Sequence, residues 1–272
     1  MKTLPILFLM SLVFFACKPK EEEGKIKLAV QAWSYNKFSL EEAAKLASKI
    51  GFKYIELFPG QKLKPGQEAT TSYKMPEADR QTMRDILKDA DITFAQYGVV
   101  SCDNKADWIE LFEFAKAFDI RTINSEPAPA DFPLIDSLTQ AYNIRLAIHN
   151  HATGTHYSHP DTVLAAIKEA NSLIGFCADD GHWIRSGLDP VECLKKAEGR
   201  LITMHLKDMN EFDKLDAHTV PFGTGVLKAE DLIAELKRQN FEGVVTLEYE
   251  HNWDNPTPDI TESFNYLKER LN

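Results

Sequence analysis

The fold is decided by the stretch KLAVQAWSYNKFSLEEAAKLASKIGFKYIEL, residues 27–57, in which one helical segment separates two short β-rich runs. The runs are Lys27–Trp33 and Lys53–Leu57. Between them, Ser39–Ile50 has apolar residues at helical spacing, an S-x-x-E capping box at its start and Gly51 directly after its end. The stretch therefore predicts a strand, a helix and a second strand in that order.

The same order recurs along the chain with a period of about 30 residues, the length of a strand–helix–strand unit. Further strands are predicted at Ile92–Tyr97, Arg121–Ser125, Ile144–His149, Ile174–Asp179, Leu201–Leu206 and Val244–Glu248. Further helices fit Pro76–Ala90, Ala106–Phe118, Leu134–Tyr142, Pro160–Asn171, a segment beginning at Asp189-Pro190, Lys228–Gln239 and Asp259–Leu271.

Strands that alternate with helices without a long linker predict an α/β protein with a single domain, a closed (β/α)8 TIM barrel over residues 26–272. An open, doubly wound sheet is the alternative, but no G-x-G-x-x-G motif follows an early strand. In a barrel, functional residues lie at the C-terminal ends of the strands and in the loops that follow them.

The composition narrows the class of partner. The 272 residues include 31 Lys+Arg and 41 Asp+Glu, a formal net charge of -10, and 44% are hydrophobic. An acidic chain without a basic block argues against binding nucleic acid and favours small molecules as partners. Cys102, Cys177 and Cys193 cannot all pair and show no C-x-x-C spacing, which argues against a disulfide framework or a thiolate zinc site.

The N-terminus has the pattern of an export signal. A basic start is followed by an apolar run from Leu4 to Phe15 and an Ala-Cys junction, which resembles a bacterial lipoprotein signal, with Phe14 in the place where Leu is usual. We therefore predict a signal peptide over residues 1–16, lipidation of Cys17 and a tether over residues 17–25. The protein is then expected to be extracytoplasmic and to contact the membrane only through this lipid.

Polar side chains stand at the ends of the last five predicted strands. Alternation along the strands places Asp179, His205 and Glu248 on the face that points into the barrel mouth, and Glu126 follows the fourth strand. One such residue is readily explained as a helix cap or a satisfied core residue. Four that converge from different strands would be costly to bury without a ligand. Three carboxylates and one imidazole suit one divalent metal, with manganese, magnesium or cobalt preferred and zinc left open.

At these residues the chain resembles the xylose-isomerase-like barrel superfamily, which includes ketose 3-epimerases and hydroxypyruvate isomerase and, more distantly, endonuclease IV. The resemblance covers residues 26–272. It is carried by Asn-Ser-Glu126-Pro, Asp179-x-x-His182, Met-His205-Leu-Lys-Asp, the Phe222–Gly225 turn and Leu-Glu248-Tyr.

The resemblance implies that Glu126, Asp179, His205 and Glu248 bind one metal. It further implies that Glu126 and Glu248 act as an acid/base pair and that His182 holds a substrate oxygen. Two carboxylates on either side of a carbon α to a carbonyl can move a proton while a metal stabilises the enediolate.

Departures from the epimerase pattern predict different substrate contacts. No Arg stands a few residues past His205, and the fifth strand ends in His149-Asn-His151, where many relatives have a Glu before the Asn. We expect His182, His151, Glu56, Trp33 and Lys207 to bind substrate. Second interpretations stay open for some of these residues and their neighbours. Glu56 could instead form a salt bridge, and Lys207 and Asp208 could orient the metal ligands. The three tryptophans near strand ends could form either a sugar-binding wall or loop packing: Trp33, Trp183 and Trp253.

The leading functional prediction is a metal-dependent isomerase or epimerase that abstracts the proton α to the carbonyl of an unphosphorylated sugar or sugar acid. The alternative is a lyase or hydratase that acts on 3-keto-glycosides with the same metal site, because the first half-reaction is shared. A third hypothesis is a non-catalytic sugar-binding lipoprotein. A phosphodiesterase is disfavoured because its chemistry needs a basic groove, which the acidic composition opposes.

Overall fold

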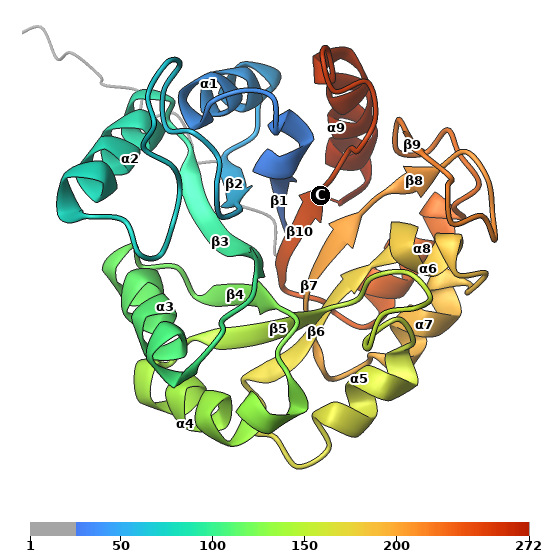
Figure 1. Cartoon of the computed structure of the whole chain (residues 1–272). Coiled ribbons are helices and arrows are strands. Elements are labelled where there is room, and N and C mark those ends of the chain that lie inside the picture. The colour runs from blue at the N-terminus through green and yellow to red at the C-terminus, as the bar shows by residue number, and fades with distance from the viewer. Residues whose placement is uncertain (1–25, 272) are drawn as a thin grey trace, which may run out of the picture.

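The computed structural model describes residues 26–271 and shows a closed barrel of parallel strands (Figure 1). The order around the ring is β1-β10-β7-β6-β5-β4-β3-β2. The strands are β1 Ile26–Gln31, β2 Tyr54–Leu57, β3 Thr93–Val100, β4 Thr122–Ser125, β5 Arg145–His149, β6 Ile174–Asp179, β7 Leu201–Leu206 and β10 Gly243–Leu247. The predicted single (β/α)8 barrel is confirmed.

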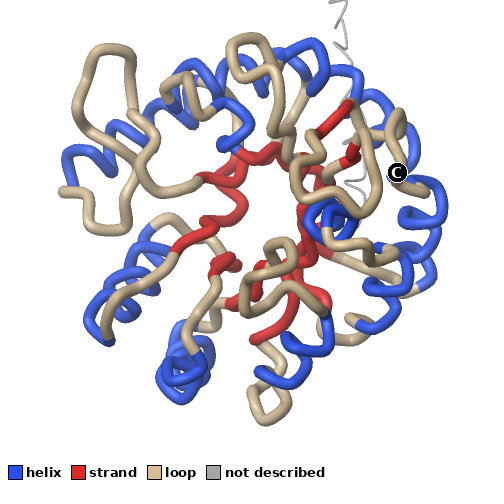
Figure 2. Tube along the Cα trace, turned by 45° about the vertical axis from the view of Figure 1, so that its right-hand side comes forward, coloured by secondary structure: helices blue, strands red, loops and turns tan. Residues whose placement is uncertain are grey.

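Helices form the outer layer, as Figure 2 shows for the blue segments around the red strands. They are α1 Leu40–Ile50, α2 Glu77–Asp89, α3 Lys105–Ala117, α4 Phe132–Tyr142, α5 Pro160–Ala166, α6 Asp180–Arg185, α7 Pro190–Lys196, α8 Ala229–Arg238 and α9 Thr257–Leu271. Short 3-10 turns, η1 Ala32–Tyr35 and η2 Pro129–Asp131, follow β1 and precede α4. The helix predicted at Pro160–Asn171 is shorter in the structure, where α5 ends at Ala166. The strand predicted at Lys27–Trp33 ends at Gln31, where η1 begins, and α6 was not predicted.

Local sequence signals explain where the helices begin. Both halves of the predicted capping box are present at α1, because the Ser39 side chain accepts from the Glu42 backbone while the Glu42 carboxylate accepts from the Ser39 backbone. At α7 the Asp189 side chain accepts from the backbone N–H groups of Val191 and Glu192, and Pro190 occupies the first helical position. These caps fix where each helix leaves the barrel mouth.

The apolar core lies between the barrel and the helices. Its largest fully buried side chains include Trp108, Phe112 and Trp183. The suggestion that Trp183 belongs to a sugar-binding wall is therefore wrong, because its ring is 0% exposed within this core. Trp33, in contrast, remains 40% exposed.

A hairpin that the sequence did not predict, β8 Asp208–Met209 paired with β9 Thr219–Val220, extends the loop after β7. The Asp208 carboxylate accepts backbone hydrogen bonds from Gly223, Gly225 and Leu227. A Cβ at Gly225 would lie 2.3 Å from Asp208 Oδ1, so this turn needs glycine. Asp208 therefore fixes the Phe222–Gly225 turn through its carboxylate. This is a different role from the orientation of metal-binding side chains that the sequence left open for it.

Within residues 26–271, none of the helices combines the length and apolar character needed to cross a bilayer. The predicted signal peptide, the lipidated Cys17 and the tether over residues 17–25 lie outside the described residues.

Candidate active site

Three of the four predicted metal ligands meet at the barrel mouth. Asp179 ends β6, His205 lies near the end of β7 and Glu248 directly follows β10. His205 Nδ1 lies 2.9 Å from Glu248 Oε2 and 3.7 Å from Asp179 Oδ2, and all three side chains are buried. One ligand atom from each lies within 4.8 Å of the others. The strand-end alternation therefore placed these side chains correctly.

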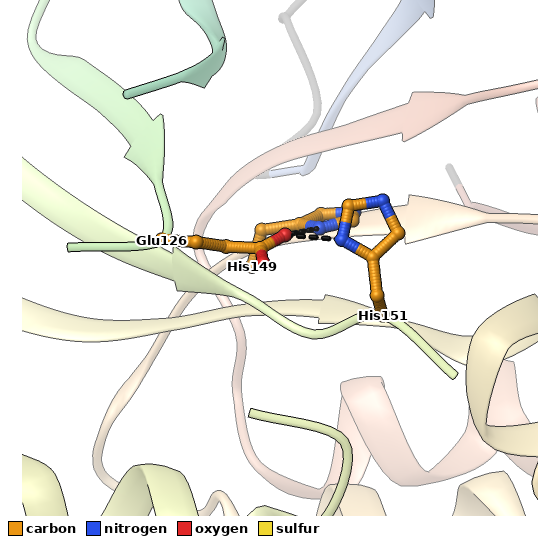
Figure 3. Close-up of side chains that lie close together, drawn as sticks. All are labelled: Glu126, His149 and His151. Atoms are coloured by element: carbon orange, nitrogen blue, oxygen red, sulfur yellow. Dashed lines mark hydrogen bonds and ion pairs between the residues drawn. The ribbon is translucent and has the colours of Figure 1, made fainter. Parts of the chain in front are cut away.

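Glu126, the fourth predicted ligand, lies beside two imidazoles instead of joining this group. Its Oε1 is 3.1 Å from His149 Nδ1 and also contacts His151 Nδ1 (Figure 3). His149 Nε2 in turn lies 3.2 Å from Asp179 Oδ2. The expectation of one common centre for four ligands is thus only partly met, because the imidazoles at the end of β5 hold the Glu126 carboxylate and His149 links the two groups.

His149 was missed as a site residue, although the sequence contained a signal for it. It is the last residue of β5, and alternation along the strand places His149 and His151 on the same side. Glu250 was missed too, because it lies two residues beyond the predicted Glu248.

Lys207 places its ammonium among the carboxylates. Its side chain is 1% exposed, and Nζ lies 3.1 Å from oxygens of Asp179, Glu248 and Glu250. Arg185 also reaches Glu250, at 3.4 Å. Lys207 is thus part of the site itself and the cation that balances its negative charge.

Glu56 was predicted to contact substrate, but the structure places it away from the cavity. It is completely buried, and its two oxygens accept hydrogen bonds from Asn124, Gln96 and Thr246 at 2.7–2.8 Å. His205 Nε2 lies 3.0 Å from Oε1 and 3.1 Å from Oε2. All of its acceptor capacity is used inside the barrel, so Glu56 supports His205 from below instead of facing a ligand.

A cavity of about 310 Å³ opens above these residues. Four of the five residues predicted to bind substrate line it, namely His182, His151, Trp33 and Lys207. Glu248 and His149 line it as well, so a ligand in the cavity would reach both groups of ionisable side chains.

The charges of the site are strongly coupled. Burial acts to raise the pKa of Asp179, but the Lys207 ammonium and the surrounding histidines lower it well below its ordinary value. Burial likewise opposes ionisation of Glu126, yet hydrogen bonds from His149 and His151 lower its pKa to about 2. Burial lowers the pKa of His182 well below its ordinary value. At neutral pH Asp179 and Glu126 are therefore ionised and His182 is neutral.

The donor set suits a divalent cation. His205 Nδ1 is buried, and the direction of its contact with Glu248 is not that of a hydrogen bond, so it has no hydrogen-bond partner among the described residues. Burial opposes protonation of His205, but the neighbouring negative charges, Glu56 and Glu248 among them, raise its pKa well above the ordinary value. With Nε2 donating to Glu56, Nδ1 is the nitrogen that would bind a metal, and the metal would take the place of its proton. The Lys207 ammonium shows that the neighbouring oxygens already surround a positive charge. Asp179, His205 and Glu248 could thus hold a metal with open positions.

Residues 44–270 match the family described as xylose isomerase-like TIM barrel, which is most of the chain. The chain belongs to this family. Its relatives include an inosose dehydratase of Clostridium botulinum, 30% identical over 145 residues that cover 47% of this chain and 48% of that protein. An inosose dehydratase of Clostridium perfringens is 29% identical over 157 residues, 51% of this chain and 52% of that protein. The chain thus spans about half the length of the curated relatives it matches.

Several solved structures share the fold over nearly the whole chain. An uncharacterised protein of Parabacteroides distasonis has a TM-score of 0.73 and 29% identity over 90% of this chain and 99% of that one. A D-tagatose 3-epimerase-like protein has a TM-score of 0.72 at 16% identity over 90% and 97%. A Mycobacterium smegmatis barrel in complex with magnesium has a TM-score of 0.71 at 15% identity over 90% and 96%. The last two show likeness of fold alone.

Proposed function

We propose that this protein is a metal-dependent lyase that eliminates a β-substituent from a polyhydroxylated ring ketone, a 3-keto-glycoside or an inosose. The observation that carries the proposal is the contact between Glu126 and His151 at the cavity wall. With Nδ1 engaged by Glu126, His151 keeps Nε2 to exchange a proton with substrate. An imidazole on one side and the Glu248 carboxylate on the other form an unlike pair, which suits elimination.

The reaction uses the pair in two steps. Glu248 removes the proton from the carbon α to the ketone, and the C–H electrons form an enediolate. The bond from the β-carbon to its oxygen substituent then breaks, the electrons form the carbon–carbon double bond, and the leaving oxygen takes a proton from His151. An α,β-unsaturated ketone and water, or an alcohol, are the products.

Asp179, His205 and Glu248 would hold the metal. Glu126 is connected to this group through His149, which contacts Glu126 with Nδ1 and Asp179 with Nε2. A bound divalent cation supplies a Lewis acid that polarises the carbonyl and stabilises negative charge on its oxygen. Manganese, magnesium or cobalt suits these donors. Lys207 and His182, which line the cavity, position the hydroxyl groups of the substrate.

The names of the relatives support this proposal over the leading prediction from sequence, since the matching halves belong to dehydratases. Epimerisation is the second candidate, and one observation favours it. β4 and β10, which carry Glu126 and Glu248, stand opposite each other in the strand order, so the two carboxylates can approach a ring from opposite faces.

The deciding experiment is an assay of the full chain with Mn²⁺ in deuterated water on inosose, methyl 3-keto-β-glucoside and a ketohexose. Elimination predicts an enone absorbance from the ring ketones and deuterium at the α-carbon of recovered substrate. An epimerised, deuterated ketohexose without enone would favour the second candidate. Binding without turnover or exchange would contradict both and favour a sugar-binding protein.

We also propose that the protein is an exported lipoprotein anchored through Cys17. The basic start, the short apolar run and the Ala-Cys junction support this proposal. Mass spectrometry of the membrane fraction should find an acylated Cys17 at the mature N-terminus. Recovery of residues 1–16 on the mature protein would contradict it.

A further inference from the structure

A second and larger hollow adjoins the cavity. It has a volume of about 840 Å³ and shares Trp33, Phe58 and Pro59 with the cavity as common lining. Its other walls are the segment 36–38 that follows η1, the start of α1 and the loop through residues 60–66, which belongs to the long connection from β2 to α2 (Figure 1). We call this hollow the outer groove. The cavity alone, at about 310 Å³, is at the lower end of the range of about 300–1,000 Å³ for ligand sites and suits one sugar ring.

Trp33 stands at the boundary between the cavity and the outer groove. Its ring meets Phe58 edge to face at 5.0 Å and 88°, and Trp253 at 6.2 Å and 77°. The neighbouring residues of η1 are buried, whereas Trp33 is 40% exposed. An aromatic ring that is held by two aromatic neighbours and is open to solvent is a ready platform for the apolar face of a sugar.

The floor of the outer groove is already formed. The Gln61 amide donates to Phe38 O at 3.2 Å, and the Thr71 hydroxyl donates to Phe58 O at 2.6 Å. Leu40 N at the start of α1 donates to Lys62 O at 2.8 Å. Because these bonds fix the loop to η1 and α1, a ligand would not have to order it first.

The rim offers two polar side chains without a polar partner among the described residues. Among residues 26–271, Lys64 forms no ion pair and the Asn36 side chain has no hydrogen bond, and both residues are half-buried and line the outer groove. Lys37 and Lys62, on the same rim, are paired with Asp254 and Glu68. Lys64 and Asn36 are therefore free to bind hydroxyl groups.

We propose that the outer groove binds the leaving group of the substrate, and that the substrate is a two-ring 3-keto-glycoside instead of a single-ring ketone. The proposal rests on the proposed function and adds the class of substrate. The oxidised ring occupies the cavity, Trp33 stacks against the junction of the rings, and the second ring lies along Asn36 and Lys64. The proton from C2 goes to Glu248, the C1–O bond breaks, and the departing sugar takes its proton from His151. An unsaturated keto-sugar and a free sugar result.

Affinity measured without turnover tests the groove. In the full-length Glu248→Gln protein with Mn²⁺, calorimetry should give a Kd for 3-keto-cellobiose about 10-fold below that for methyl 3-keto-β-glucoside, which lacks the second ring. Adding Asn36→Ala and Lys64→Ala should remove most of this difference, since each lost hydrogen bond is worth a few-fold in affinity. The Kd for the methyl glycoside should stay within about twofold. Lys168→Ala, an exposed lysine outside the groove, is the matched control and should change neither Kd.

Equal affinities for the two ketones would overturn the proposal, as would a double variant that weakens both equally while its melting temperature stays unchanged. The proposed function fails differently. Tighter two-ring binding, lost in the double variant, without enone from either ketone in wild type would support the groove and contradict the elimination.

Discussion

Replacing Glu56 by Gln tests whether this buried carboxylate prepares His205 for metal binding. Every group that faces the Glu56 oxygens is a donor: Asn124 at 2.7 Å, Gln96 at 2.7 Å, Thr246 at 2.8 Å and His205 Nε2 at 3.0 Å. A glutamine amide presents one oxygen and one NH₂, so its NH₂ must face at least one of these donors. The variant keeps the size of the side chain but loses half of its acceptor capacity and its charge.

The magnitude follows from the burial. Glu56 is completely buried, so donors left without an acceptor bear their full desolvation cost, and the lost charge leaves His205 without its partner. Removing one partner of a buried charged pair costs roughly 3–5 kcal/mol of stability. Loss of a carboxylate that orients a metal-binding histidine typically weakens metal affinity by about 10–100-fold.

The assay is a competition titration of Mn²⁺ against a chelator, together with urea unfolding of the metal-free protein. Glu262→Gln, on the exposed face of α9, is the control and should change neither quantity. A folded Glu56→Gln protein with the Kd of wild type for Mn²⁺ would refute the role of Glu56 in orienting His205. Loss of stability with unchanged affinity would limit Glu56 to a structural role.

Three further results are expected. Glu248→Gln should lower turnover by about 10²–10⁴-fold in the enone assay, because it removes the proton acceptor; retention of turnover would contradict that role. Lys207→Met should destabilise the chelator-treated protein by roughly 3–5 kcal/mol in urea, because Asp179 keeps no ammonium beside it, and Mn²⁺ should restore much of this. Ionised Glu126 stabilises the fold above its ordinary pKa of 4.5, and this contribution should be lost as the pH falls toward its folded pKa of about 2. The stability of wild type relative to Glu126→Gln, measured in chelator, should therefore fall across this window by on the order of 3 kcal/mol.

The fold was predictable from the sequence because its signals are local and repeated. Each barrel strand is a short β-rich run, and caps such as Ser39 and Asp189 mark where helices begin. The elements that were missed lack such signals. β8 and β9 have two residues each, and their pairing depends on a long-range contact from Asp208 to the turn at Gly225. α6 follows β6 directly, without a turn residue between them.

Half of the site was predictable for the same reason, and the other half was not. Asp179, His205 and Glu248 lie at strand ends, where alternation along the backbone fixes which way a side chain points. Glu126 follows its strand, so its rotamer, which no pattern encodes, decides which partner it meets. Glu56 was expected either to contact substrate or to form a salt bridge, and its depth below the mouth, which decides between the two, depends on the stagger of the strands around the barrel.

The cluster at the mouth differs in kind from the rest of the core. Most of the buried interior of residues 26–271 is apolar, whereas at the mouth a single buried ammonium contacts Asp179, Glu248 and Glu250. Burying charges in this way is costly, and well-packed apolar side chains would often be as stable or more so. The main apolar core is one connected cluster of buried residues, so the fold has a large source of stability apart from the charged groups. Buried carboxylates that line a cavity can take part in chemistry only if a cation or a polarised substrate binds next to them. The buried charged cluster and the pattern of polar residues at the strand ends therefore both indicate that the functional site lies at the barrel mouth.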